Sequence, residues 1–355
     1  MHITSPGQSP ATTDNLLTPV RVGALELPNR LVMAPMTRKR ADEDGVPQPV
    51  MAQYYAQRAS AGLIITESAA AIPFGAGYGS LVGFFDERQE PAWRKIVDAV
   101  HAESGRIALQ LWHVGRARTE QDGLGKGRNW VITEELRPER LTEDEVRAIP
   151  RDFGAAARRA RELGFDAVEL HAGTGNLMDR FLRSTSNRRA DDYGGSAASR
   201  VRVLFESLAA IAAEIGGDRT GLKISPVWQV DGRPDPTGRE SFAYLLGRLA
   251  EVDLAYLHVN RATEEDLRVG ADASITLEWL REHWAGTLLA AGGFDREQGE
   301  QAIAKGLADA VVYGRPFLAN PDLPARYGAR APLNPLNRET LYSNTGEGLI
   351  DYPSL

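Results

Sequence analysis

The stretch Leu288–Arg315, LLAAGGFDREQGEQAIAKGLADAVVYGR, contains the repeating unit that decides the fold. Two aliphatic runs, Leu288–Ala291 and Ala310–Tyr313, lie near its ends and predict short buried strands. The segment between them, Gln298–Lys305, has a helical pattern and stops at Gly306. A strand, a helix and a second strand in this order predict a parallel sheet covered by helices.

Equivalent apolar runs recur along the rest of the chain. Six of them have the length of a buried strand, and helix-like segments separate most of them: Leu31–Pro35, Leu63–Thr66, Ile107–Trp112, Ala167–His171, Gly221–Ser225 and Ala255–Val259. With the two runs above they make eight strands that alternate with helices. This pattern predicts an α/β fold, a single (β/α)8 TIM barrel, in preference to an open doubly wound sheet.

One helix carries clear end signals. Thr142 and Glu145 have the spacing of a capping box, and the helical pattern that follows stops at Gly164. Pro150 lies within this segment, and we expect it to kink the helix or divide it in two, because proline lacks the N–H that a helix interior uses.

Composition excludes several classes of protein. The 355 residues include no cysteine, so disulfides, thiolate metal sites and a cysteine nucleophile are ruled out. The formal net charge of −7 argues against a nucleic-acid partner, and no apolar run reaches the roughly 20 residues of a membrane helix. The Ser/Thr/Pro/Gly-rich start does not resemble a secretion signal. We expect a cytoplasmic protein with a flexible segment, 1–15, and one barrel domain, 16–355.

Function in such a barrel collects where the strands end. Gly292-Gly293 and Gly314-Arg315 follow the last two strands, where barrel phosphate sites are built from backbone N–H groups and a basic side chain. The alternative is that these glycines only permit tight turns. Two long connections, Gly115–Arg140 and Arg261–Ser274, are expected to extend over the same end of the barrel.

Three histidines near strand ends raise a second class of function, a metal-dependent hydrolase. His113, His171 and His258 are the candidates, and Glu169 shares a strand face with His171. No His-x-His pair occurs, and the first strand offers no ligand. We therefore expect no metal site.

Several motifs decide between these possibilities. They occur in one collinear order from about Leu17 to Leu355: Leu27–Arg38, Ala59–Glu67, Leu109–Arg116, Asn187–Ser196, Ala290–Asp295, Tyr313–Pro324 and Asp351-Tyr352-Pro353. Together they strongly resemble the old yellow enzyme family of FMN-dependent oxidoreductases. The resemblance implies a (β/α)8 barrel with FMN at the carboxyl ends of its strands. Within Asn187–Ser196, the charges of alternating sign are expected to pair with one another in a structural loop.

The resemblance also implies cofactor-binding residues. The backbone of Ala34, Pro35 and Met36 would line the flavin, and Thr37 would donate a hydrogen bond to its C4 carbonyl. Gln110 would pair with the pyrimidine edge of the ring. The phosphate would be held by Gly292, Gly293, Gly314 and Arg315.

Two cofactor positions depart from the family pattern. Lys223 stands where an arginine is usual, beside the flavin N1 and C2 carbonyl, so the charge is kept but the planar fork is lost. Ser68 stands where a small alanine is common and adds a hydroxyl near the ring.

The substrate side departs further. His171 matches the family histidine that polarises a substrate carbonyl, whereas Thr174 replaces the second nitrogen donor and Asn176 replaces the tyrosine that delivers a proton. An amide cannot serve as a general acid at neutral pH. Tyr78 resembles a retained pocket tyrosine, and Leu349 stands where relatives carry another, which predicts a more apolar pocket.

Three functions remain open at this point. The first is NADPH- or NADH-driven reduction of an activated alkene, an unsaturated carbonyl compound, with the proton taken from solvent or from Tyr78. The second is a specialised biosynthetic flavoenzyme that isomerises or dehydrogenates its substrate. The third is a flavin-binding protein without catalysis, which retention of His171, Thr37 and Gln110 disfavours.

Overall fold

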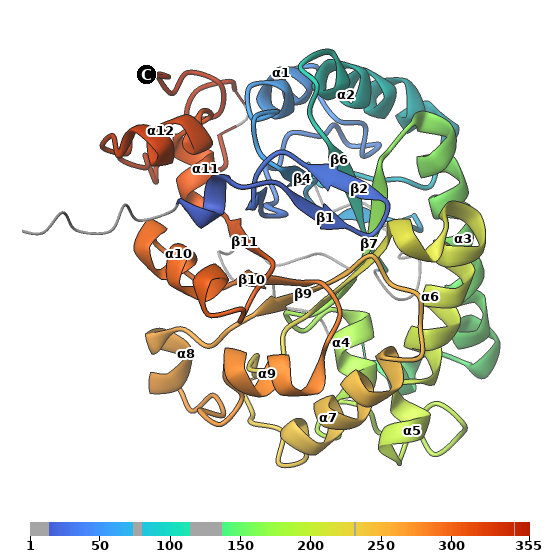
Figure 1. Ribbon diagram of the computed structural model, residues 1–355. Helices are drawn as coiled ribbons and strands as arrows, with labels where there is room; N and C mark the ends of the chain where they lie inside the picture. Colours follow the sequence, from blue (N-terminus) through green and yellow to red (C-terminus); the bar gives the residue numbers. More distant parts are fainter. Residues whose placement is uncertain (1–13, 74–79, 114–136, 231, 344) are drawn as a thin grey trace, which may run out of the picture.

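Eight parallel strands form a closed barrel. The computed structural model describes residues 14–73, 80–113, 137–230, 232–343 and 345–355. The barrel strands are β3 (Leu31–Met33), β4 (Leu63–Ile65), β6 (Ile107–Trp112), β7 (Ala167–Ala172), β8 (Thr220–Ile224), β9 (Tyr256–Asn260), β10 (Leu288–Ala291) and β11 (Ala310–Tyr313). They neighbour one another in the order β4-β3-β11-β10-β9-β8-β7-β6, and the β4–β6 pairing closes the ring (Figure 1). The predicted barrel is confirmed, and a further short strand, β5 (Ala69–Ala70), extends the sheet beside β6.

Helices surround the barrel (Figure 1). They are α1 (Val50–Ala56), α2 (Glu90–Ala102), α3 (Glu143–Leu163), α4 (Leu177–Leu182), α5 (Ala197–Arg200), α6 (Arg202–Ile215), α7 (Gly238–Leu249), α8 (Glu264–Arg268), α9 (Leu277–His283), α10 (Arg296–Ala304), α11 (Arg315–Ala319) and α12 (Leu323–Ala329), with 3-10 turns η1 (Asn15–Leu17), η2 (Glu87–Gln89), η4 (Pro138–Arg140) and η5 (Gly217–Arg219). The larger hydrophobic core lies between helices and strands and includes Phe153, Leu170 and Leu204.

Helix α3 is continuous through Pro150, so the proline does not divide it as one of our expectations allowed. Both ends are fixed: Thr142 and Glu145 form the predicted capping box, and Gly164 ends the helix in a left-handed conformation with φ +89°. The face that includes Phe153 is buried, and α3 packs along α6. Burial and capping offset the hydrogen bond that Pro150 cannot donate.

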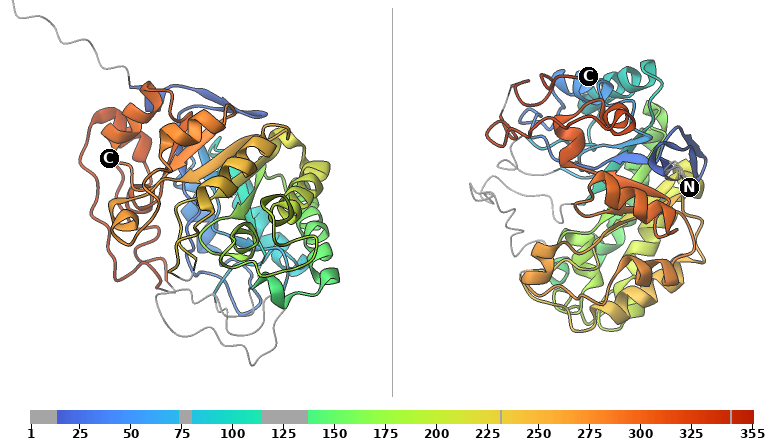
Figure 2. Two further views of the ribbon diagram at one scale, coloured as in Figure 1. Left: turned by 90° about the horizontal axis from the view of Figure 1, so that it is seen from below. Right: turned by 60° about the vertical axis from the view of Figure 1, so that its left-hand side comes forward.

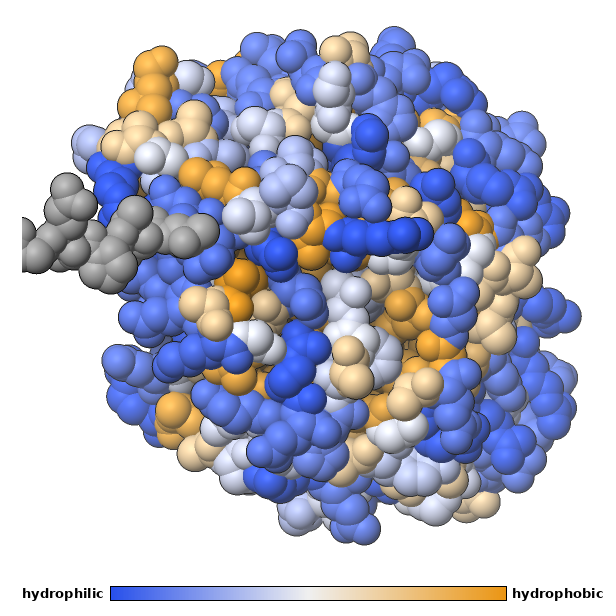
Figure 3. Space-filling model, viewed as in Figure 1, coloured by the Kyte–Doolittle hydropathy of each residue, from blue (hydrophilic) through white to orange (hydrophobic). Residues whose placement is uncertain are grey.

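A β-hairpin that the sequence analysis does not predict closes the amino end of the barrel. Strands β1 (Val20–Val22) and β2 (Leu25–Leu27) pair antiparallel and lie across the barrel in Figure 1. Leu25 and Leu27 join the barrel-interior core, which contains Val32 and Tyr256 among others. The views in Figure 2 place the hairpin at one end of the barrel, and the face around it in Figure 3 is mostly hydrophilic.

Towards the carboxyl ends of the strands the barrel interior becomes polar. Residues that pair across neighbouring parallel strands point to the same side of the sheet. Gln110 on β6 pairs in register with Glu169 on β7, and His171, Lys223 and His258 are aligned across β7, β8 and β9. All five side chains are buried. This polar layer marks the end of the barrel at which the functional residues are predicted.

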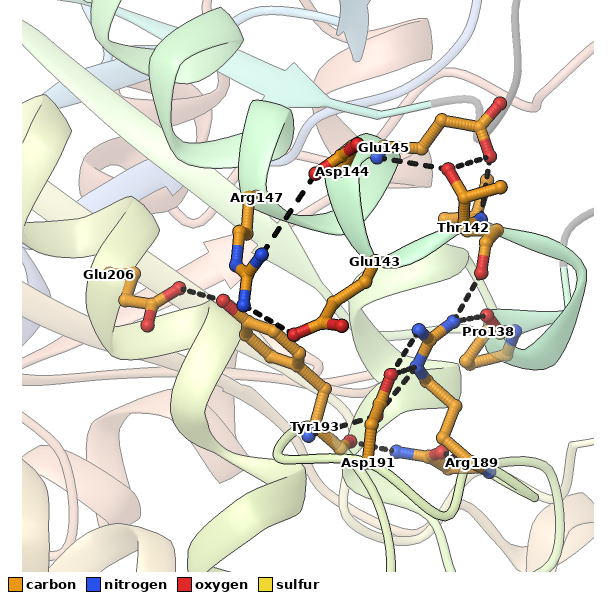
Figure 4. A network of polar contacts seen from close by, with 12 residues as sticks. Pro138, Thr142, Glu143, Asp144, Glu145, Arg147, Arg189, Asp191, Tyr193 and Glu206 are labelled. Atoms are coloured by element: carbon orange, nitrogen blue, oxygen red, sulfur yellow. Dashed lines mark hydrogen bonds and ion pairs between the residues drawn. The ribbon is translucent and has the colours of Figure 1, made fainter.

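The predicted pairing of charges within the loop after α4 is found for Arg189 and Asp191. Arg189 forms an ion pair with Asp191 and also donates to the backbone oxygens of Pro138 (2.5 Å) and Leu141 (2.6 Å) (Figure 4). Asp192 lies 3.5 Å from Arg202. These charges hold one loop against η4 and the start of α3, which is a structural function.

Both ends of the described chain are fastened to the barrel. Asp14 pairs with Arg296, and the backbone N–H of Asn15 donates to Glu300 (2.8 Å). The fully buried guanidinium of Arg58 donates to backbone oxygens that include that of Leu349 (3.2 Å). The division into a 1–15 segment and a 16–355 domain stays a prediction, although Asp14 and Asn15 make contacts of their own.

Within the described part of the chain, every helix falls short of the length and apolar content that a bilayer crossing demands. The cytoplasmic location stays a prediction.

Candidate active site

The predicted cofactor residues come from neighbouring strands. Met36 follows β3 and Gly314 follows β11: a side chain at Gly314 would lie 3.4 Å from the Met36 sulfur. Ala34 donates its backbone N–H to Tyr313 (3.0 Å) and so continues the β3–β11 pairing past the end of the strand. Pro35, Met36 and Thr37 are partly exposed at this end of the barrel.

The segment after Thr37 is held by a carboxyl group that the sequence analysis does not single out. Glu67, at the end of β4, is almost fully buried, and its Oε2 accepts the backbone N–H of Arg38 at 2.9 Å. Among the described residues, no group forms a hydrogen bond with its Oε1. Burial raises the pKa of Glu67 to about 7, against the opposing influence of the Arg38 N–H and of the charges on Arg38 and Arg40.

Two glycine-containing turns lie side by side where phosphate binding is predicted, because β10 and β11 are neighbours. Gly292 and Gly293 have positive φ angles of +118° and +70°, which favour glycine. Arg261 supports this turn: its Nε donates to the oxygen of Gly292 (2.9 Å), and its guanidinium stacks 3.7 Å from the ring centre of Phe294. Arg261 was not among the predicted site residues.

Arg315 opens α11 and is exposed. Its guanidinium makes no hydrogen bond or ion pair within the part of the chain that the structure describes. An unpaired cation beside two glycine turns is suited to bind an anion such as a phosphate.

Lys223 lies inside the barrel between His171 and His258. It is 8% exposed, and among the described residues its ammonium has no hydrogen-bond partner. Burial lowers the pKa of Lys223, and Glu169 is the negative charge that opposes this effect. When it is protonated, this buried ammonium can stabilise a negatively charged group placed next to it.

Gln110 is oriented by two neighbours. Its Nε2 donates to Glu169 Oε1 (2.5 Å), and its Oε1 accepts a hydrogen bond from the Ser68 hydroxyl. The other oxygen of Glu169 bonds to Nδ1 of His258 at 3.0 Å. His258 is fully buried, and together with Gln110 it occupies both oxygens of Glu169.

His171 and Thr174 come together as the substrate-side prediction requires. Thr174 Oγ1 lies 3.2 Å from His171 Nε2, and Thr174 adopts a left-handed backbone conformation with φ +55°. Burial, reinforced by the positive charge of Lys223, holds the pKa of His171 well below its usual value. The imidazole is therefore neutral near pH 7.

Asn176 is occupied by a structural task. Its Oδ1 accepts the backbone N–H of Asp179 (3.2 Å) as the N-cap of α4, and its Nδ2 donates to the oxygen of His171 (2.8 Å). Both the oxygen and the nitrogen of the amide thus have partners, and these contacts give no support to a role of Asn176 in catalysis. Asn176 instead fixes the chain that carries His171 and Thr174.

The two pocket residues expected beside these have different outcomes. Leu349 is fully buried in the larger core, so it does not face an open pocket. Tyr78 lies outside the described residues, as does most of the Gly115–Arg140 connection.

The Arg261–Ser274 connection contains α8, capped by Thr263. Across the described ranges, His, Asp and Glu side chains form no group of three that could hold a metal ion.

Comparison with known proteins defines the class of this barrel. Residues 15–334 match the NADH:flavin oxidoreductase / NADH oxidase family. The 12-oxophytodienoate reductase 2 of Arabidopsis thaliana is 39% identical over 360 residues, which cover 96% of each chain. The protein is an FMN-dependent oxidoreductase.

Solved structures narrow the assignment. Morphinone reductase superposes with a TM-score of 0.86 at 37% identity, covering 97% of this chain and 98% of its own. The old yellow enzyme homologue from Zymomonas mobilis gives a TM-score of 0.87 at 35% identity, covering 96% and 100%. The chain belongs to the old yellow enzyme family.

The residues at this end of the barrel fit FMN. The buried ammonium of Lys223 lacks a hydrogen bond within the described structure, and Arg315 is an unpaired cation beside the Gly292-Gly293 and Gly314 turns. A doubly charged phosphate and an electron-rich ring are the two parts of FMN that such cations suit.

Proposed function

We propose that this protein reduces activated alkenes of the enone type, with NADPH or NADH as the hydride donor. The observation that carries the proposal is the close pair of His171 and Thr174. The relatives support it, since they include 12-oxophytodienoate reductases and morphinone reductase. A structure of morphinone reductase in complex with tetrahydroNAD supports a nicotinamide donor.

The His171–Thr174 pair can hold one carbonyl oxygen. Two atoms 3.2 Å apart can both approach a single acceptor at hydrogen-bond distance. The neutral imidazole donates from Nε2, and the hydroxyl of Thr174 donates beside it. Both hydrogen bonds strengthen as negative charge develops on the carbonyl oxygen, so they favour the transition state over the ground state.

The remaining predicted residues would hold the cofactor. When bound, FMN supplies hydride transfer at its N5 position. Thr37 and Gln110 would contact the carbonyl edge of the ring, with the backbone of Ala34–Met36 along it, and Lys223 would lie near its negative side. The glycine turns and Arg315 would bind the phosphate.

One observation favours the second candidate function, isomerisation or dehydrogenation. The family tyrosine that delivers a proton is replaced by Asn176, whose amide caps α4 with its oxygen and donates to the oxygen of His171 with its nitrogen. Loss of a positioned acid typically costs about 10²–10⁴ in rate. Alkene reduction would then need Tyr78 or a water molecule as the proton source.

Anaerobic stopped-flow absorbance separates these functions. The enzyme is reduced with NADPH or NADH and then mixed with an enone; reoxidation supports the reductase. Bleaching of the oxidised enzyme by a saturated ketone supports the dehydrogenase. If the flavin spectrum responds neither to pyridine nucleotides nor to carbonyl compounds, both functions are overturned.

The His171→Ala variant tests the site itself. We expect weaker binding of phenol-type ligands and slower turnover, with FMN still bound, because His171 donates to the ligand oxygen. Thr174→Ala is the matched variant and should show a smaller effect. Unchanged turnover in His171→Ala would remove that residue from the mechanism.

A further inference from the structure

The carboxamide of Gln110 is bonded at both ends inside the barrel. Its side chain is 1% exposed, its Nε2 donates to Glu169 and its Oε1 accepts from Ser68. Its backbone N–H donates to Thr66 Oγ1 at 3.1 Å. The amide therefore has one fixed position rather than a choice of rotamers.

Glu169 determines which way the amide points. Burial alone would raise the pKa of Glu169, but His258, Lys223 and Gln110 together outweigh it and hold the pKa below its ordinary value. An ionised carboxylate only accepts hydrogen bonds, so it must face the NH2 group of Gln110 and not its oxygen.

The groups around Glu169 keep it in this state. His258 on β9 bonds to its second oxygen, and Lys223 on β8 supplies a positive charge. Tyr256 on β9 lies above Gly221, where a Cβ atom would come within 2.3 Å of the tyrosine ring. Burial and the negative charge of Glu169 raise the pKa of Tyr256 well above its usual value, so it stays neutral. On β7 itself, His171 is neutral as well.

Ser68 fixes the amide from the opposite side. Its hydroxyl is the donor in the contact with Gln110 Oε1, because an amide oxygen can only accept. A primary amide has two N–H groups and two oxygen lone pairs. Once Glu169 and Ser68 take one of each, a single N–H and a single lone pair remain for another partner.

We propose that Ser68 and Glu169 are positioning residues that fix the orientation of the Gln110 amide, so that its remaining donor and acceptor face the pyrimidine edge of FMN. That edge carries an acceptor carbonyl beside a donor N–H, which is the complementary pattern. This inference rests on the proposed function, in which Gln110 contacts the cofactor. Neither Ser68 nor Glu169 needs to touch the reacting atoms.

The test measures FMN release from the holoenzyme by recovery of free-flavin fluorescence on dilution, together with the visible flavin spectrum. The variants are Ser68→Ala, Glu169→Gln and Gln110→Ala. Glu169→Gln should raise the FMN dissociation constant about tenfold, because a neutral amide can present either end to Gln110. Ser68→Ala should raise it about threefold and shift the spectrum, since the ring loses an oriented hydrogen-bond partner.

The double variants decide the argument. In the Gln110→Ala background, Ser68→Ala should have no further effect on FMN release, because it acts through the amide. Glu169→Gln should have a smaller effect there than in wild type, since Glu169 also influences Lys223. Full additivity would overturn the proposal. Ser68 lies at a partly exposed position, so its variant remains informative if Glu169→Gln does not fold.

Failure of the inference is distinguishable from failure of the proposed function. If Gln110→Ala weakens FMN binding while Ser68→Ala and Glu169→Gln leave it unchanged, only the positioning argument is overturned. If Gln110→Ala itself has no effect, the contact between Gln110 and FMN is wrong, and the inference falls with it. Enone turnover is a separate measurement: it tests the proposed reaction, not the orientation of the Gln110 amide.

Discussion

Replacing Glu67 by glutamine should make the protein progressively more stable than wild type as pH rises. Glu67 is almost fully buried, and burial raises its pKa to about 7 from an ordinary value of 4.5. The folded protein therefore binds a proton at Glu67 that the unfolded chain releases. The contribution of Glu67 to the free energy of unfolding is therefore greatest below pH 4.5, its ordinary pKa, and is lost as pH rises through about 7, its pKa in the folded protein.

The size of the effect follows from the two pKa values. Each pKa unit corresponds to about 1.4 kcal/mol, so the rise from 4.5 to about 7 amounts to about 3 kcal/mol. For 355 residues, an unfolding entropy of about 2.1 cal/mol/K per residue converts this into about 4 °C in Tm. The Tm of Glu67→Gln minus that of wild type should increase by about 4 °C between pH 4.5 and 8.

The assay is thermal unfolding of both FMN-loaded proteins, followed by circular dichroism at several pH values. Other titrating groups are common to both proteins and cancel in the difference. Any fixed cost of the extra NH2 group shifts all points equally. Glu26→Gln is the matched control, because Glu26 is exposed beside Arg21. A Tm difference that does not change with pH would refute the reasoning.

Two further predictions concern packing and backbone strain. Gly299→Ala should lower the free energy of unfolding by about 1–3 kcal/mol, because its Cβ would lie 2.0 Å from the hydroxyl oxygen of Tyr313. Tyr313→Phe removes that oxygen, so the double variant should lose less Tm than the two single variants together. Strictly additive losses of Tm would contradict this prediction. Thr174→Asn should raise Tm by about 1 °C, because asparagine tolerates the left-handed backbone at φ +55° better than a β-branched residue does. A lower Tm would mean that the contact between Thr174 and His171 stabilises the fold more than the backbone strain destabilises it.

The strands could be predicted well because each is a short, nearly continuous apolar run. Ile107–Trp112, Leu288–Ala291 and Ala310–Tyr313 agree with the structure to the residue. The predicted strand Gly221–Ser225 is Thr220–Ile224 in the structure, and the predicted Ala255–Val259 is Tyr256–Asn260. Each differs by one residue, since strand ends depend on hydrogen bonds to neighbouring strands. The hairpin Val20–Leu27 has alternating polarity around Gly23 and offers a signal that the analysis did not use.

The site could be predicted only as far as single strands allow. Alternation places Glu169 and His171 on one face, but it cannot show that Glu169 contacts Gln110 and His258. Those pairings depend on the register between strands around a closed barrel, which one strand does not encode. Asn176 shows a similar limit: its position suggests catalysis, whereas its place before a helix gives it a capping role.

Closure of the barrel has a consequence for synthesis on the ribosome. Leu31 on β3 pairs with Val311 on β11, 280 positions later in the chain. At a translation rate of about 5–20 residues per second, β3 is synthesised about 15–55 s before β11. The nascent chain therefore exposes an unpaired edge of β3 during that time, and an unpaired edge is a site at which strands of other chains can add. Pairing across so long a separation in sequence also favours slow folding.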